Sequence, residues 1–267
     1  MPEINSNTRW LTIRIGRGTL AFAMSSDDEE SIIYEPYVVK SGISMAANLR
    51  EAFRKADLLL EHPQRARVLL DSDVLMVPID LFEEETMETM YHHAFPQSSQ
   101  DAVYYNVLPD LNAVAVFAMN RDLRLVIDDH FKDVRLVVAV SPVWRHLHQR
   151  SFTGNRHKLY AYFHEKQIDI FSFQQNRFKF CNSFTAGRPH DSLYFLLYVW
   201  KQLQLQPEHD ELHVVGDIPE QEWLLSELKK YLQKAYVINP AADFNQAPVT
   251  QIKGMPYDLQ TLFVKGR

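Results

Sequence analysis

The sequence predicts an α/β protein in which two successive units each place antiparallel strands before alternating helices and strands. Three observations lead to this prediction. The composition is that of a globular chain, with 46% hydrophobic and 23% charged residues among 267. Two distant segments share an alternating strand pattern, and the elements that follow them come in the same order. Mixed sheets with helices packed against them are the architecture that this order favours.

The two similar segments are residues 11–22 and 159–170, which align without a gap. Each is typical of two strands joined by a tight turn. Their coinciding apolar positions are Leu11 with Leu159, Ile13 with Ala161, Ile15 with Phe163, Leu20 with Ile168, and Phe22 with Ile170. We interpret the pair as an internal duplication, and the repeated order of elements carries more weight than the short match.

In the first half, hydrophobic periodicity predicts five further strands and three helices. The strands are expected at 32–40, 66–70, 103–108, 113–119 and 134–140, and the helices at 44–60, 81–94 and 121–131. The apolar stripe of the helix at 44–60 consists of Met45, Leu49, Phe53, Ala56 and Leu60. Pro78 and Pro219 are both expected near the start of a helix, where a missing N–H costs nothing.

In the second half we expect strands at 178–184, 211–215 and 259–264, and helices at 191–205 and 220–235. The helix at 191–205 is apolar almost all round, so we expect it to be deeply buried. A polar stretch at 149–156 predicts the boundary between the halves. The predicted domains are therefore 1–150 and 151–267.

Charge and cysteine content narrow the classes of function. The net charge of −6 argues against a nucleic-acid partner bound through overall positive charge. A single cysteine excludes an intramolecular disulfide framework and any site that needs several cysteines. The N-terminus has no signal-peptide pattern, and no apolar run is long enough to span a bilayer. We therefore expect a cytoplasmic protein without membrane insertion.

Two tandem β-β-β-α-β-α units resemble the actin-like ATPase superfamily, whose halves are ribonuclease H-like. The chain is similar to FtsA-type and PilM-type proteins. More narrowly, it resembles an uncharacterised family of Bacteroidetes proteins with an actin-like fold. The landmarks of this resemblance are the stretch 77–82 (VPIDLF) and the stretch 191–200 (DSLYFLLYVW). The resemblance covers almost the whole chain, and the short length indicates that large inserted subdomains are absent.

The resemblance implies an ATP site in a cleft between the halves, with its first phosphate loop at residues 14–20. Gly16 and Gly18 fit this loop, because glycines let backbone N–H groups approach a phosphate. Arg14 stands where the superfamily has the acid that handles magnesium, and a cation cannot ligate that metal. Arg14 would instead bind an anion, together with Arg17 and Thr19. The alternative, which we favour, is a solvated hairpin turn whose glycines permit positive φ.

The second phosphate loop aligns with residues 162–167, which contain no glycine. Tyr162 occupies the acidic position, and Glu165 adds a negative charge where a phosphate would lie. This segment argues most strongly against ATP hydrolysis.

The adenosine-binding element of the superfamily aligns with residues 212–219. Gly216 matches the first of its two glycines, whereas Asp217 replaces the second. An ordinary strand-to-helix turn explains the same residues, with Gly216 relaxing the backbone and Asp217 capping the helix. Both interpretations stay open.

Other chemistry-bearing residues have simpler explanations. His146 and His148 would share one face of a strand, but no metal-binding spacing completes a site. Cys181 lies in an apolar segment and is expected to be a buried structural thiol. Asp71 and Asp73 are expected to form a turn between two strands rather than a cation site. No catalytic or metal-ligating residue is predicted.

Two further segments bear on partners. The acidic run 27–30 is expected to be a solvated hairpin connection. The aromatic residues between Tyr160 and Phe184 are expected to alternate into a sheet core, and any that face outward would mark a protein-binding surface.

The leading hypothesis is a pseudo-ATPase: a non-catalytic, actin-like protein that acts as a scaffold or interaction module. Its partner would be an unidentified protein or a second copy of the chain, and it would need no cofactor. The alternative is a module that binds a nucleotide such as ATP, or another anion, with residual or no hydrolysis. Its candidate contacts are Arg14, Gly16, Arg17, Gly18, Thr19, Gly216 and Asp217. A kinase-like phosphotransferase using Asp71 or Asp73 ranks last.

Overall fold

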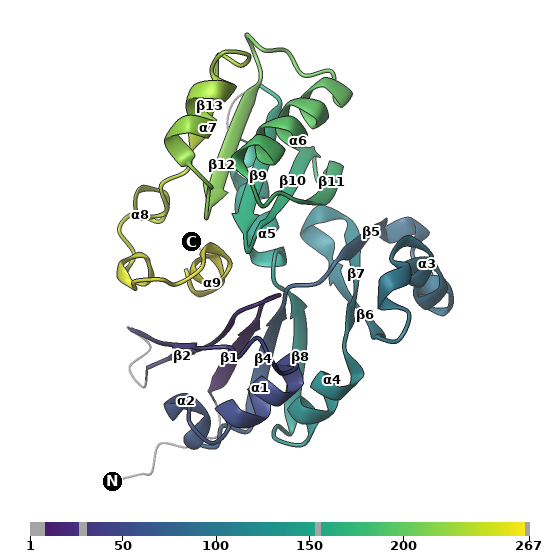
Figure 1. The fold of residues 1–267 in the computed structure, drawn as a ribbon. Helices are drawn as coiled ribbons and strands as arrows, with labels where there is room; N and C mark the ends of the chain where they lie inside the picture. Colours follow the sequence, from purple (N-terminus) through teal and green to yellow (C-terminus); the bar gives the residue numbers. More distant parts are fainter. Residues whose placement is uncertain (1–8, 27–30, 153–155, 265–267) are drawn as a thin grey trace. The chain divides into compact units, whose positions relative to one another are not determined.

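The computed structural model describes residues 9–26, 31–152 and 156–264, and the chain divides into two compact units (Figure 1). The first unit comprises Met1–Val107, Val114–Ser141 and Ile252–Met255, and the second comprises Leu108–Ala113, Pro142–Gln251 and Pro256–Arg267. The acidic run 27–30 lies outside the described residues. The longest segment of the second unit begins at Pro142; the domain boundary after residue 150 stays a prediction.

The first unit is built on a five-stranded sheet of order β3-β2-β1-β4-β8. Its strands are β1 (Trp10–Ile15), β2 (Leu20–Ser25), β3 (Ile32–Tyr37), β4 (Arg65–Leu70) and β8 (Asp133–Val138). Strands β1, β2 and β3 are antiparallel neighbours, while β4 runs parallel to both β1 and β8. All five strands lie close to where the sequence predicts them.

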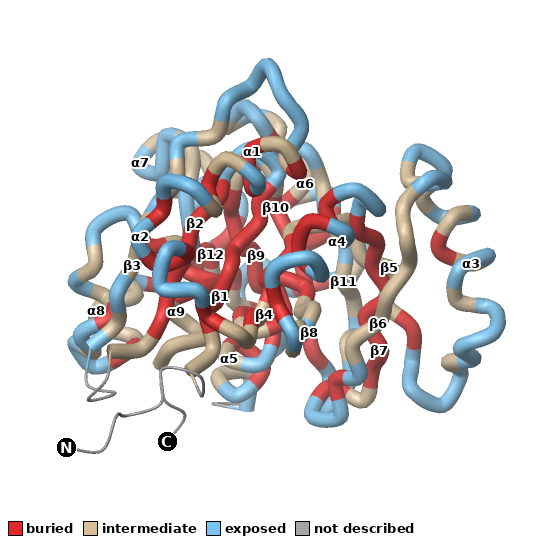
Figure 2. Tube along the Cα trace, turned by 90° about the horizontal axis from the view of Figure 1, so that it is seen from below, coloured by how far each residue is buried: buried red, intermediate tan, exposed pale blue. Residues whose placement is uncertain are grey.

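The second unit is built on a sheet of order β11-β10-β9-β12-β13. Its strands are β9 (Lys158–His164), β10 (Gln167–Gln174), β11 (Arg177–Thr185), β12 (Glu211–Gly216) and β13 (Ala235–Val237). The antiparallel and parallel pairings repeat those of the first sheet position by position. The predicted fold class, an α/β fold with mixed sheets in two units, is confirmed. Figure 2 shows that the central strands of both sheets are deeply buried.

A smaller sheet of order β5-β7-β6 completes the first unit. It consists of β5 (Val74–Pro78), β6 (Ala102–Leu108) and β7 (Ala113–Met119), with α3 (Met87–Ala94) packed against it. The sequence predicts β6 and β7 but gives no bounds for β5, which it implies only through the turn at Asp71 and Asp73. Pro78 therefore ends a strand instead of starting a helix, and the helix expected at 81–94 begins only at Met87.

Eight further α-helices occur among the described residues. They are α1 (Met45–Ala52), α2 (Asp57–Leu60), α4 (Arg121–Asp128), α5 (Ser141–Ser151), α6 (Pro189–Gln202), α7 (Gln221–Leu228), α8 (Pro240–Asp243) and α9 (Tyr257–Phe263). The helix predicted at 44–60 is broken into α1 and α2. The Glu35 carboxylate accepts hydrogen bonds from the backbone amides of Asp57 and Leu58, 3.0 Å each, and so fixes a new helix start. Leu60 is consequently exposed, while Leu58 and Leu59 are buried.

Three other predictions about helices are wrong. The tail segment expected as a strand at 259–264 is the helix α9. Residues 146–148 lie in the helix α5, where buried Val143, Trp144 and Leu147 have helical spacing, so a strand with two histidines on one face does not form. The helix α6 buries one face only, because Tyr194 is 62% exposed and Tyr198 is 46% exposed.

Candidate functional site

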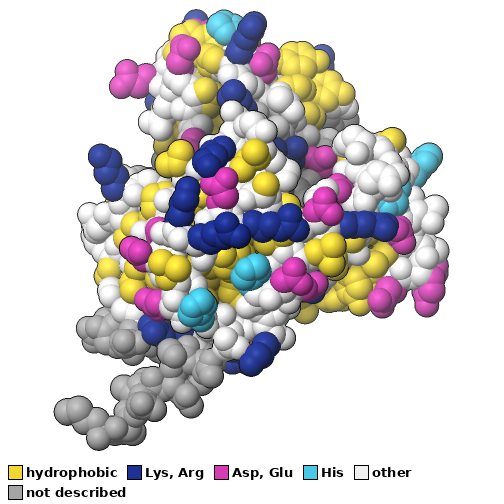
Figure 3. Space-filling view, turned by 60° about the horizontal axis from the view of Figure 1, so that its bottom comes forward, with side chains coloured by type: hydrophobic (Ala, Val, Ile, Leu, Met, Phe, Trp, Pro, Cys, Tyr) yellow, Lys and Arg dark blue, Asp and Glu magenta, His cyan; other side chains and the backbone are white. Residues whose placement is uncertain are grey.

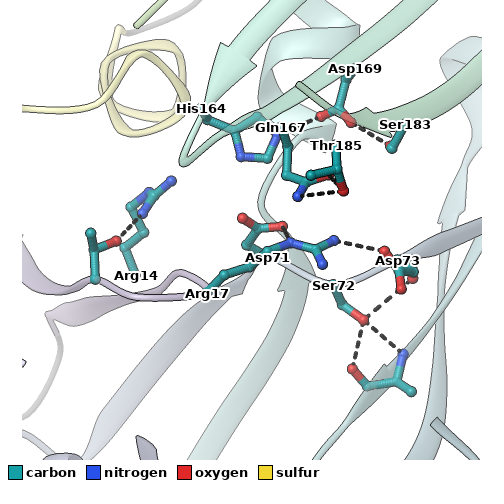
Figure 4. A network of polar contacts seen from close by, with 12 residues as sticks. Arg14, Arg17, Asp71, Ser72, Asp73, His164, Gln167, Asp169, Ser183 and Thr185 are labelled. Carbon is teal, nitrogen blue, oxygen red and sulfur yellow. Dashed lines mark hydrogen bonds and ion pairs between the residues drawn. The ribbon is translucent and has the colours of Figure 1, made fainter. Parts of the chain in front are cut away.

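In the first unit, the candidate residues gather where the parallel strands β1 and β4 both end (Figure 4). Ile15 lies opposite Leu70, and the Asp71 N–H donates to the Ile15 carbonyl at 2.9 Å. The turn from Gly16 to Thr19 therefore lies beside residues 71–73. Carboxyl ends of parallel strands are the usual place for ligands in open α/β sheets.

The Arg17 guanidinium contacts two carboxylates of this loop (Figure 4). Its Nη2 lies 2.7 Å from Asp73 Oδ1, and its Nε lies 3.5 Å from Asp71 Oδ1. Gln97 donates to the second oxygen of Asp73 at 3.2 Å. The two carboxylates offset the positive charge of Arg17 and repel a phosphate, so the local charge is poor for an anion.

Arg14 is buried within β1, and its Nη1 donates to Thr19 Oγ1 at 2.9 Å. The turn closes through the Gly16 N–H, which donates to the Thr19 carbonyl at 2.9 Å. A Cβ added at Gly18 would meet no atom within 4 Å. Among the described glycines, positive φ occurs at Gly216 and Gly254, so this turn does not use the left-handed conformation that the sequence suggested.

The loop that carries the two carboxylates is fixed by buried groups. Ser72 Oγ donates to the Ala118 carbonyl at 2.9 Å, and the hydroxyl of the fully buried Tyr91 donates to the Asp73 carbonyl at 2.9 Å. The loop joins β4 to β5, which confirms the prediction of a turn between two strands.

In the second unit, the turn between β9 and β10 consists of two residues without a glycine. Glu165 and Lys166 both have positive φ, 43° and 65°, between the paired residues His164 and Gln167. Non-glycine side chains in the left-handed region cost roughly 1–2 kcal/mol each. The aligned loop of the superfamily requires glycines, whereas here two side chains occupy the turn.

Sequence reasoning missed a polar cluster beside this turn. His164 Nε2 lies 2.9 Å from Asp169 Oδ2, and the Ser183 hydroxyl donates to the other oxygen of Asp169 (Figure 4). Asp169 lies opposite Tyr162 and Ser183 on the neighbouring strands, so only strand register brings the three polar residues together. Since the serine donates to the carboxylate and not to the imidazole, the order differs from that of a catalytic triad.

Gly216 is the last residue of β12, and its backbone lies close to that of β9. Its φ is +98°, and a Cβ built there would lie 2.1 Å from the Phe163 carbonyl oxygen. The same oxygen accepts a hydrogen bond of 2.9 Å from the Asp217 N–H. The contact between the strands therefore explains why position 216 needs glycine. The helix α7 begins at Gln221 with Glu220 as its N-cap residue, so the prediction that Asp217 caps it is wrong.

Of the seven candidate contacts, Arg14, Gly16, Arg17, Gly18 and Thr19 lie together in the first unit, whereas Gly216 and Asp217 belong to the second. Cys181 is half-buried, and burial together with the nearby Asp169 raises the pKa of its thiol well above the ordinary value. The described residues contain no group of three or more His, Cys, Asp or Glu placed to hold a metal ion. They also contain no helix long and apolar enough to cross a membrane.

A buried ion network lies elsewhere in the second unit. The side chain of Asp243 is almost fully buried and pairs with His146 at 2.6 Å, with Arg150, and with the Tyr257 hydroxyl at 3.1 Å. These contacts join α5, α8 and α9. Burial, followed by the charge of Arg150, lowers the pKa of His146 to about 4. The neutral imidazole then donates to the carboxylate, which is a structural role.

The family model described as "Protein of unknown function (DUF3822)" matches residues 2–235. The chain belongs to the DUF3822 family. A DUF3822 chain with this fold agrees with the sequence-based resemblance to an uncharacterised family with an actin-like fold. A search among curated proteins gives no match.

Solved structures extend the comparison. A Bacteroides thetaiotaomicron VPI-5482 protein with an actin-like ATPase fold and unknown function is 27% identical. The match has a TM-score of 0.85 and covers 100% of this chain and 99% of that one. The PilM–PilN type IV pilus biogenesis complex matches with 12% identity and a TM-score of 0.56, over 96% and 98% of the two chains. This DUF3822 protein therefore has an actin-like ATPase fold.

Proposed function

We propose that this DUF3822 protein is a pseudo-ATPase that acts as a scaffold or protein-interaction module. The observation that carries the proposal is the turn between β9 and β10. Glu165 and Lys166 fill it with side chains, and Glu165 adds a negative charge where the related loop would hold a phosphate. Backbone N–H groups must approach a phosphate closely, which bulky side chains oppose.

The first unit supports the same proposal. Arg14 replaces the acid that would handle magnesium, and Arg17 is engaged by two carboxylates at 2.7 and 3.5 Å. A site that has lost its metal-handling acid lacks the electrostatic stabilisation on which phosphoryl transfer depends.

Two further observations support a role in interaction. Large aromatic side chains are exposed on the second unit, namely Tyr194, Tyr198, Tyr231 and Tyr236. PilM, which shares the fold, has been solved in a complex with PilN. The proposal includes an origin of the two units by duplication, supported by their common strand order, and a cytoplasmic location, supported by the single cysteine.

A second candidate function is anion or nucleotide binding without hydrolysis. The observation that favours it is Arg14, a buried guanidinium at the carboxyl end of a parallel strand, hydrogen-bonded to Thr19. This alternative would take ATP or a related anion as its ligand.

Two measurements test both candidate functions. The first is a thermal-shift titration with ATP, ADP and GTP, with and without magnesium, and the second is an assay for phosphate release. A ligand that binds only the native state adds about 2.7 kcal/mol at a hundredfold excess over Kd. We expect no shift and no phosphate release. A saturable shift without hydrolysis would support the second candidate instead.

The matched variant for this test is Gly18→Val. Position 18 has open space around a Cβ, so valine would obstruct a phosphate without a steric clash in the fold. Gly216→Val is unsuitable, because it would collide with Phe163. Magnesium-dependent ATPase activity that Gly18→Val removes would overturn the leading proposal.

A further inference from the structure

The two large sheets have four edge strands. In the part of the chain that the structure describes, three of these edges are protected against pairing with another strand. The edge strand β3 contains Pro36, which cannot donate to another strand. The side chain of Asn106 accepts from the Val138 N–H and donates to the Leu136 carbonyl, 2.9 Å each, and so occupies the edge of β8. The edge strand β13 has three residues only. Short strands, prolines and covering groups are the usual ways to block edge-to-edge pairing.

The fourth edge, β11, lacks these protections. It has nine residues, contains no proline, and pairs with β10 alone. Its Ser183 N–H donates to the side-chain oxygen of Asn182 at 2.9 Å instead of to a strand. Both residues are exposed, so another strand can reach this part of the edge, where pairing would replace the bond between Ser183 and Asn182.

A row of aromatic side chains runs from β11 onto the neighbouring helix α6. The rings of Phe184 in β11 and Phe195 in α6 are stacked, with centroids 4.5 Å apart. Phe195 contacts Tyr194, and Tyr194 stacks on Tyr198 at 5.9 Å. The two tyrosines are 62% and 46% exposed. Hydrophobic side chains reach the surface at several places on the face of the molecule that Figure 3 shows. Aromatic residues are enriched at protein interfaces.

We propose that β11 pairs antiparallel with β11 of a second copy of this chain, around a two-fold axis at Asn182. This inference rests on the proposed function, because it names the partner of the interaction module. The pairing would join two five-stranded sheets into one continuous sheet. Both copies of α6 would then lie on the same face of that sheet, where Tyr194 and Tyr198 of one copy would cover those of the other.

The side-chain pattern of β11 favours this register. With Asn182 opposite itself, Phe180 of each copy lies opposite Phe184 of the other, which forms two aromatic cross-strand pairs. Lys179 lies opposite Thr185, so no like charges face each other. The irregular pairing with β10 occurs before Phe180, which leaves residues 180–185 in regular register. A two-fold axis makes such an interface self-complementary.

The first test is the mass of the full chain by light scattering and sedimentation over a wide range of concentrations. We expect a monomer–dimer equilibrium in which Asn182→Lys raises Kd about tenfold or more, since two lysines would face each other. The control is Tyr231→Glu, which adds a charge at another exposed tyrosine and should leave Kd unchanged. A chain that stays monomeric, or a dimer that Asn182→Lys leaves intact, overturns the proposal.

The second test uses the single native cysteine to fix the register. In a Cys181→Ser background, Asn182→Cys should give a disulfide-linked dimer under mild oxidation, because the two sulfurs face each other across the axis. The control is Cys181→Ser with Glu208→Cys, which places the thiol at an exposed position outside the strands. It should not give a disulfide-linked dimer. Equal crosslinking of the two variants contradicts the register. Neither result depends on nucleotide binding, so the dimer and the pseudo-ATPase proposal can fail separately.

Discussion

A Cβ at residue 216 would lie 2.1 Å from the carbonyl oxygen of Phe163, so the end of β12 tolerates only glycine at this contact. The family resemblance offered a second explanation, in which Gly216 makes room for a nucleotide. The backbone of β9 already accounts for the glycine, and the positive φ of 98° gives an independent reason. A glycine that matches a nucleotide motif can therefore be retained for strand packing alone.

The first prediction concerns this contact. Gly216→Ala should lower the free energy of unfolding by about 3 kcal/mol or more, because backbone atoms must move and φ becomes strained. Urea denaturation measures the change. Gly187→Ala is the control, since a Cβ there meets no atom within 4 Å and the φ is not positive. A loss at Gly216 as small as that at Gly187 would contradict the steric argument.

The second prediction concerns the turn between β9 and β10. Lys166→Gly should raise the free energy of unfolding by about 1 kcal/mol, because glycine adopts the left-handed conformation of residue 166 without a side-chain penalty. Thermal and urea denaturation measure the gain. Lys179→Gly, in the exposed edge strand β11, is expected to be destabilising, so opposite signs are the diagnostic result. A destabilised Lys166→Gly variant would mean that the lysine side chain makes contacts worth more than the backbone strain.

Much of the fold follows from local patterns. Period-two alternation placed β1, β2, β9 and β10 correctly, because each packs an apolar face against a core within its own unit. The broken helix at 44–60 was not predictable in this way, since Glu35 comes from a strand earlier in the chain. The tail helix was mistaken for a strand because a short apolar run fits either element.

The candidate site was less predictable than the fold. The glycines and arginines of the turn at 16–19 were found from the resemblance, but their partners were not. Arg17 and Asp73 are 56 positions apart, and only the parallel pairing of β1 with β4 brings them together. The cluster around Asp169 likewise depends on strand register, which spacing alone did not reveal.

The third prediction tests the pairing of Arg17 with Asp73. A double-mutant cycle with Arg17→Ala and Asp73→Ala should give a coupling free energy of about 0.5–1 kcal/mol, because the pair is partly exposed. High salt should reduce the coupling. Arg124 and Asp128, an exposed pair within α4 at 2.7 Å, provide a reference cycle. Zero coupling at low salt would mean that Asp73 does not hold Arg17.

The fourth prediction concerns pH. Burial and Arg150 lower the pKa of His146 to about 4 in the folded chain, whereas the unfolded value is about 6.5. Between these values the unfolded chain binds more protons, so the free energy of unfolding should fall as the pH falls from 6.5 to 4. The stabilisation that the neutral His146 contributes is complete above pH 6.5 and amounts to at most about 3.4 kcal/mol. Urea denaturation across this range measures it.

The matched variant is His146→Gln, whose amide can still donate to Asp243 but does not titrate. The difference between wild type and variant isolates the histidine from the carboxylates that titrate in the same range. We expect the wild type to lose more stability per pH unit than the variant, by up to about 1.4 kcal/mol. Parallel pH profiles for the two proteins would show that His146 is protonated equally in the folded and unfolded chains, and its role as a neutral donor to Asp243 would have to be abandoned.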